Sequence, residues 1–150
     1  MAINLKSTKG VVTDGGVKVL VYGGSGAGKT TLIGTLPEPI IISAEAGLLS
    51  LADLDIPYIE VKDMASLREA YSFVSSEESA GFRSVAIDSI SEIAEVVLNA
   101  EKKQTKDPRQ AYGALQEQMT DLIRAFRDLS GKNVYMSAKM EKQMRVFSNT

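Results

Sequence analysis

The chain has 150 residues, of which 44% are hydrophobic and 24% charged, and its formal net charge is −2. This length and composition are typical of one globular domain with a substantial core. With no Cys and no His, the sequence excludes disulfides, thiolate nucleophiles, Cys-ligated zinc and Ser-His-Asp hydrolases. Any catalysis would use carboxylates, Lys, hydroxyls, backbone amides and a hard cation such as Mg²⁺.

No apolar run approaches the length that spans a bilayer, and the N-terminus lacks the apolar stretch of a signal peptide. We therefore expect no membrane partner and a cytoplasmic location, which is the host cytoplasm if a phage encodes the chain. The charge is unevenly spread: residues 1–100 carry a net −6 and residues 101–150 a net +4. Such a basic bias suits either a solvated surface or a face for an anionic ligand.

The first half predicts an alternation of strands and helices. Residues 1–16 are expected to form a flexible lead-in, and residues 17–150 the folded core. A buried, β-branched strand over 17–22 runs into a Gly-rich loop and a helix from 29 to about 36, which Pro37 stops. The later elements of this half are a strand over 40–43, a strand over 58–61 and a helix over 64–79.

The second half continues the alternation. A strand over 84–88 ends in Asp88, and the capping-box pattern of residues 89–92 begins a helix. A polar break over 101–110 precedes a second amphipathic helix, which we expect Gly131 to end. A strand over 134–137 and a further one near 144–147 follow. The pattern predicts an α/β fold with a mainly parallel sheet covered on both faces, and we expect the chain to be a truncated version of a longer fold.

The loop after the first strand matches the phosphate-binding P-loop, Gly-x-x-x-x-Gly-Lys-Thr, in the required strand–loop–helix context. Its glycines allow the backbone to wrap closely around phosphates, and the amides at the helix start point at them. We expect Lys29 to neutralise the β- and γ-phosphates, Thr30 to ligate Mg²⁺ and Thr31 to reach the α-phosphate. The predicted nucleotide-binding set is Gly23, Gly24, Ser25, Gly26, Ala27, Gly28, Lys29, Thr30 and Thr31.

Polar residues at strand ends complete the predicted site. Asp88 ends a strand, where an acid can hold Mg²⁺ beside the P-loop. Glu45 follows the strand over 40–43 and is the candidate general base for an attacking water, the alternative being a solvated loop residue. Ser137 is the candidate polar sensor of the γ-phosphate. Glu92 and Glu95 are interpreted as capping and helix-surface residues.

Three segments, over 23–31, 41–45 and 85–89, resemble the core of RecA-like ATPases. The stretches over 90–95, 106–113 and 134–139 resemble, more particularly, phage nucleotide-binding proteins of the AAA/RecA-like type associated with single-strand annealing recombination. The resemblance covers about residues 15–147. It implies a three-layer α/β P-loop NTPase sandwich, Mg²⁺-dependent ATP hydrolysis with Glu45 as catalytic base, and a homo-oligomer. Position 43 is Ser where the family often has Asp.

The resemblance also implies nucleic-acid partners. In RecA-like proteins the loops after the acid-bearing strand's helix and after the next core strand line a DNA channel, so single-stranded DNA and a phage single-strand binding protein are expected partners. The implied phosphate-contacting residues are Lys102, Lys103, Lys106, Arg109, Lys139, Lys142 and Arg145. The last three are alternatively a finger that reaches a neighbouring subunit's γ-phosphate.

Two other functions remain open from the sequence. A small P-loop phosphotransferase would need an Arg-rich lid, and no such segment is evident. A non-hydrolysing nucleotide-binding module would regulate a partner through its bound state. A GTPase is disfavoured because the sequence has no Asn-Lys-x-Asp and no Asp-x-x-Gly after the acid-bearing strand.

Overall fold

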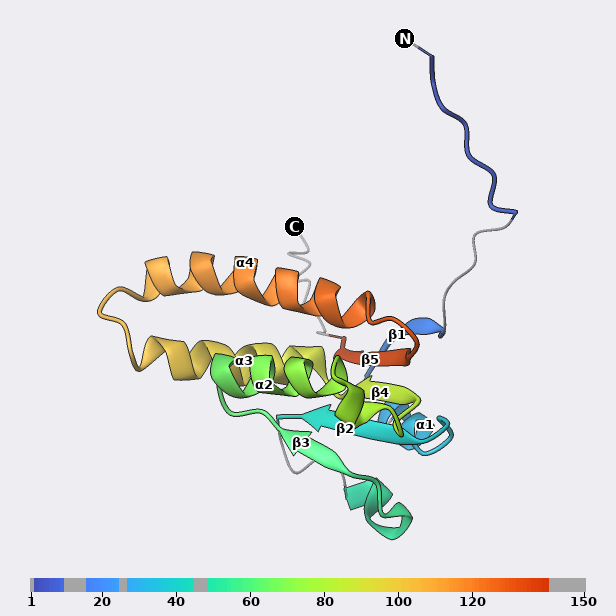
Figure 1. The fold of residues 1–150 in the computed structure, drawn as a ribbon. Coiled ribbons are helices and arrows are strands. Elements are labelled where there is room, and N and C mark those ends of the chain that lie inside the picture. The colour runs from blue at the N-terminus through green and yellow to red at the C-terminus, as the bar shows by residue number, and fades with distance from the viewer. Residues whose placement is uncertain (1, 10–15, 25–26, 45–48, 141–150) are drawn as a thin grey trace, which may run out of the picture.

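A five-stranded parallel sheet forms the centre of the fold (Figure 1). The computed structural model describes residues 2–9, 16–24, 27–44 and 49–140. Every strand pair is parallel, and the order across the sheet is β1-β5-β4-β2-β3. The strands are β1 (Lys18–Gly23), β2 (Pro39–Ser43), β3 (Tyr58–Glu60), β4 (Ser84–Ile87) and β5 (Asn133–Lys139). The predicted α/β fold is confirmed.

Helices cover the two faces of the sheet unequally. Three of them, α2, α3 and α4, lie together on one face, and α3 and α4 form a hairpin that extends beyond the ends of the strands (Figure 1). None of the described helices combines the length and apolar character needed to cross a membrane. The helices are α1 (Lys29–Ile33), η1 (Leu49–Leu54), α2 (Met64–Val74), η2 (Glu77–Ser79), α3 (Ile90–Lys102) and α4 (Pro108–Arg127).

Strand alternation divides the core into two clusters. Successive side chains of a strand point to opposite faces, so Ile40 and Ile42 pack under α2–α4 while Ile41 packs on the α1 side. The same division separates Val134 and Met136 from Tyr135 in β5. Because both faces of the central strands are buried, these strands are apolar runs rather than polar–apolar alternations.

β1 corrects the expectation of a buried strand. Leu20 is 57% exposed and Tyr22 is 69% exposed. Among the described residues β1 pairs with β5 alone, so it forms an edge of the sheet and has no strand on its other side. Of the β1 residues, Val21 alone packs against the core cluster on the α1 face.

Two predicted helices are shorter than expected. After α1, residues 34–36 continue as turns whose N–H groups donate to the carbonyl three residues earlier. After α2, the hydroxyls of Ser75 and Ser76 donate back to the carbonyls of Tyr71 and Phe73. Such local bonds compete with the helical pattern, so α2 ends at Val74 and only η2 follows.

The end of α4 also differs from the prediction. The helix ends at Arg127, and the N–H of the capping residue Asp128 donates to the carbonyl of Arg124. Gly131 lies in the turn that leads into β5, where its φ of 74° is a conformation that favours glycine. The glycine therefore marks the turn and not the helix terminus.

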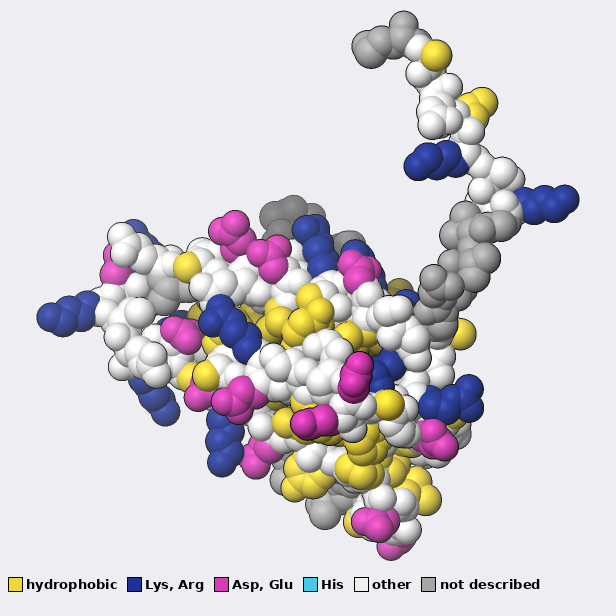
Figure 2. Space-filling model, viewed as in Figure 1, with side chains coloured by type: hydrophobic (Ala, Val, Ile, Leu, Met, Phe, Trp, Pro, Cys, Tyr) yellow, Lys and Arg dark blue, Asp and Glu magenta, His cyan; other side chains and the backbone are white. Residues whose placement is uncertain are grey.

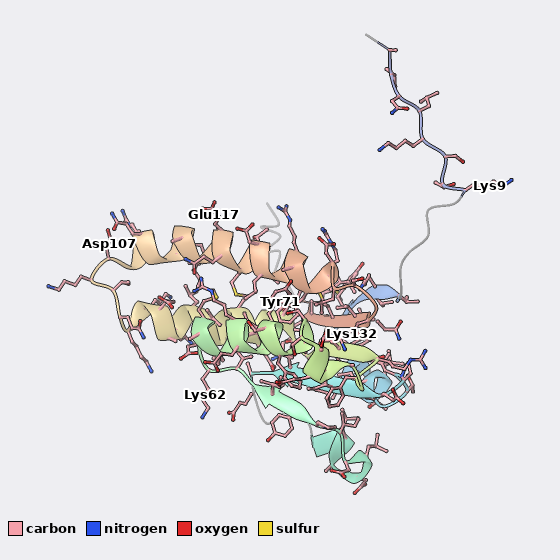
Figure 3. The ribbon with its side chains drawn as sticks, in the orientation of Figure 1. Lys9, Lys62, Tyr71, Asp107, Glu117 and Lys132 are labelled. Atoms are coloured by element: carbon pink, nitrogen blue, oxygen red, sulfur yellow. The ribbon has the colours of Figure 1, made fainter. Side chains whose placement is uncertain are left out.

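Phe126 offers a test of the core under the helical layer. Its ring is 1% exposed and meets the ring of Tyr71 edge to face at 5.2 Å between centroids. Figure 3 shows Tyr71 between the helices. We expect Phe126→Ala to lower the free energy of unfolding by about 3–5 kcal/mol, because it opens a cavity in a packed core. Urea denaturation measures the change.

Tyr112 is the matched control on the same helix, because its side chain is 48% exposed. Tyr112→Ala should change the free energy of unfolding by no more than about 0.5 kcal/mol. Equal losses in the two variants would contradict the packing of α4 described above.

Candidate nucleotide-binding site

The predicted phosphate loop connects the carboxyl end of β1 to α1. Gly23 ends β1, and the N–H of Ala27 donates to the carbonyl of Gly24 at 3.3 Å. Gly28 has a φ of 93°, which side-chain-bearing residues rarely adopt, so the loop needs glycine at this point. Ser25 and Gly26 lie outside the described residues.

Lys29 begins α1, and its ammonium group lies against the loop itself. The Nζ atom donates to the carbonyl of Gly23 and, at 3.4 Å, to the carbonyl of Gly24. Thr31 is exposed on the same short helix. The lysine charge is thus held where phosphate groups in the loop would lie.

Asp88 and two hydroxyl groups form the polar centre of the site. Thr30 donates from Oγ1 to Oδ2 of Asp88 at 2.9 Å, and Ser137 donates from Oγ to Oδ1 at 2.6 Å. Each carboxylate oxygen therefore has one hydroxyl donor, which fixes the orientation of the group. Residues from α1, from the end of β4 and from β5 meet here, although 107 positions separate Thr30 from Ser137.

These oxygen donors fit a magnesium ion. A carboxylate and a hydroxyl are hard ligands, which Mg²⁺ prefers. No cluster of three or more acidic, His or Cys residues that could hold a metal occurs in the described part of the chain. Mg²⁺ usually keeps several waters and takes phosphate oxygens as further ligands, so a site with Thr30 and Asp88 beside a phosphate loop suits it better than a purely protein site would.

Tyr135 also lies at the site, although the sequence analysis did not predict it. Its hydroxyl donates to the main-chain carbonyl of Lys29 at 2.5 Å, and its side chain is buried among residues such as Ile33 and Ile41. Burial, and secondarily the nearby charge of Asp88, raise the pKa of its phenol. The signal for this role is weak: Tyr135 stands two residues before Ser137 and so on the same face of the strand.

Ser89 and Glu92 correct the predicted capping box at the start of α3. Ser89 accepts from the N–H of Glu92 at 3.2 Å, as a capping residue does. The Glu92 carboxylate, however, pairs with the ammonium of Lys139 at the end of β5, and the N–H of Lys139 donates to Ser91 Oγ at 3.0 Å. The interpretation of Glu92 as a capping side chain is therefore wrong, and its carboxylate ties α3 to β5.

The predicted DNA-contacting residues fall into separate places. Lys102, Lys103, Lys106 and Arg109 are exposed around the connection between α3 and α4. Asp107, labelled in Figure 3, marks this tip of the hairpin, and dark blue side chains project around it in Figure 2. Lys139 meets the first turn of α3, about 15 Å along the helix from Lys102 by the rise per residue. Lys142, Arg145 and the candidate base Glu45 lie outside the described residues.

Comparisons with known proteins place the chain in a family. A family model described as an AAA domain matches residues 15–149, which is most of the chain. Among solved structures, a KaiC-like protein from Pyrococcus horikoshii is similar at a TM-score of 0.49 and 18% identity. The alignment covers 84% of this chain and 64% of that protein. No protein with curated function matches the chain. The family match, the phosphate loop and the parallel sheet show that the chain belongs to the AAA domain family of P-loop NTPases.

Proposed function

We propose that this chain binds ATP with Mg²⁺, hydrolyses it, and couples the hydrolysis to single-stranded DNA. The observation that supports the enzymatic part is the contact of Asp88 with Thr30 and Ser137 beside the Lys29 loop. This arrangement supplies a cation, a metal-binding carboxylate and a hydroxyl ligand within one small region, which is what phosphoryl transfer requires of a protein.

Each described residue has a distinct part in the proposed reaction. The loop amides and Lys29 bind the phosphates, and Thr30 and Asp88 hold the metal. Ser137 keeps the Asp88 carboxylate in one orientation through its 2.6 Å hydrogen bond. When bound, Mg²⁺ supplies charge neutralisation for the β- and γ-phosphates. Ser137 as a direct sensor of the γ-phosphate stays a prediction.

Glu45 is the proposed general base. It follows β2, and β2 pairs directly with β4, the strand that precedes Asp88. The carboxyl ends of these neighbouring strands are about 5 Å apart, and ligands of open parallel α/β sheets bind at this edge. The Glu45 carboxylate would accept the proton of the attacking water as the new oxygen–phosphorus bond forms and the bond to ADP breaks.

Four variants test the ATPase proposal. Asp88→Asn should lower turnover by about 100-fold or more, because it removes the charge that holds the metal. Glu45→Gln should lower turnover by a similar factor while ATP binding is kept, and Lys29→Ala should weaken both. Phosphate release and binding of a fluorescent ATP analogue are measured for each protein. Asp128→Asn is the matched control, since this exposed carboxylate pairs with Arg127 away from the site.

The outcomes separate the alternatives that the sequence leaves open. Equal, very low turnover in the wild type and all variants, with ATP still bound, would favour a non-hydrolysing module. Transfer of the phosphate to a nucleoside or nucleotide, in place of release as inorganic phosphate, would favour a phosphotransferase. Normal turnover in Asp88→Asn would contradict the proposed metal site.

The DNA part of the proposal rests on the basic hairpin tip, defined as Lys102, Lys103, Lys106 and Arg109. All four side chains are exposed and lie within eight positions of the sequence. Clustered Lys and Arg neutralise nucleic-acid phosphates without reading bases. The resemblance of residues 106–113 to phage annealing ATPases supports single-stranded DNA as the ligand and recombination as the process.

The salt dependence of DNA binding measures the contribution of the basic hairpin tip. Replacing the four residues of the basic hairpin tip by Gln should reduce the slope of log affinity for single-stranded DNA against log salt by about 3, because each lost phosphate contact contributes about 0.7. Fluorescence anisotropy at several salt concentrations gives the slope. The control replaces four exposed basic residues elsewhere, namely Lys6, Lys9, Lys62 and Arg83. A larger reduction of the salt slope in that control would place the DNA site elsewhere.

A further inference from the structure

The helix that begins with Lys29 is too short to fix the position of this residue by itself. α1 contains five residues, little more than one turn, and an isolated helix of that length is unstable. The residue before it, Gly28, has the backbone freedom of glycine. Contacts with other elements must therefore determine where the Lys29 backbone lies.

Two hydrogen bonds tie this segment to the end of β4 and to β5. The side chain of Thr30 is tied to Asp88 after β4 at 2.9 Å. The carbonyl of Lys29 is tied to the hydroxyl of Tyr135 in β5 at 2.5 Å. The first contact involves proposed metal ligands, so it depends on the bound state of the site. The second involves no proposed ligand and can persist throughout.

We propose that Tyr135 is a positioning residue that holds the backbone of Lys29, and with it the lysine ammonium and the following Thr30, in place for the nucleotide phosphates. This inference rests on the proposed nucleotide-binding function. Tyr135 suits the role because it is 5% exposed and comes from a central strand. Its ring packs in the cluster that contains Ile33 and Ala86, so both the base of α1 and the sheet fix its direction.

The chemistry of the phenol fits a permanent anchor. A tyrosine hydroxyl is a neutral donor, and the raised pKa of Tyr135 keeps it protonated through the physiological range. Its neutrality means that it does not compete with Lys29 for the phosphates. A small displacement of a catalytic group lowers the reaction rate, so a fixed backbone at this point affects turnover directly.

Tyr135→Phe removes the hydroxyl and keeps the ring. The carbonyl of Lys29 still faces the N–H four residues later in α1, so no buried group is orphaned and the melting temperature should stay close to that of the wild type. Tyr71→Phe is the matched control, because this half-buried tyrosine packs on Phe126 under the helical layer. Melting temperature, binding of a fluorescent ATP analogue and steady-state hydrolysis are measured for both variants.

We expect Tyr135→Phe to lower kcat/KM for ATP by about 5- to 10-fold, the worth of one buried hydrogen bond, with no such loss in Tyr71→Phe. Hydrogen exchange without nucleotide is the second readout: amides of residues 27–33 should exchange several-fold faster in Tyr135→Phe alone. This measurement needs no activity, so it tests the anchor even if the proposed ATPase function fails.

The results that overturn the inference differ from those that overturn the function. Unchanged exchange at residues 27–33 would contradict the positioning role, and so would equal kinetics for Tyr135→Phe and an active wild type. A melting temperature of Tyr135→Phe well below that of the wild type would also contradict it and assign the hydroxyl to general stability. An inactive wild type with faster exchange in Tyr135→Phe would reject the ATPase proposal and keep the anchor.

Discussion

The parallel pairing of β5 with both β1 and β4 is the constraint on which the site depends. Ile87 lies opposite Met136, and Val21 lies opposite Ser137, in the registers of these two pairs. Parallel strands end at the same edge of a sheet, so the phosphate loop, Asp88 and Ser137 come together there. The 2.6 Å and 2.9 Å contacts of Asp88 follow from this register.

Successive side chains of β5 point to opposite faces of the sheet, and one set packs in the core while the other lies at the site. Val134 and Met136 pack under α2–α4, whereas Tyr135 and Ser137 turn to the α1 face and meet Lys29 and Asp88. A shift of one residue would move Met136 into the site and both hydroxyls into an apolar core. The buried apolar residues therefore stabilise the register that the polar residues need.

Local patterns predict much of this structure, and contacts distant in sequence account for the rest. The phosphate loop, Asp88 and the central strands are recognisable because their signals are short and contiguous. The exposure of β1 cannot be recognised from the sequence, because burial of a strand depends on which strands flank it. Likewise, the pair between Glu92 and Lys139 joins residues 47 positions apart, and a capping-box pattern alone suggests a different partner for Glu92.

The position of the basic hairpin tip limits how DNA could affect ATP turnover within one chain. α3 begins two residues after Asp88 and has 13 residues, so its far end lies about 20 Å from the site. That length excludes direct contact between the tip and the phosphates. One route for coupling inside the chain runs along α3 to its first turn, where Ser89 caps the helix and Glu92 meets Lys139. The same turn contacts β5, the strand that also carries Tyr135 and Ser137.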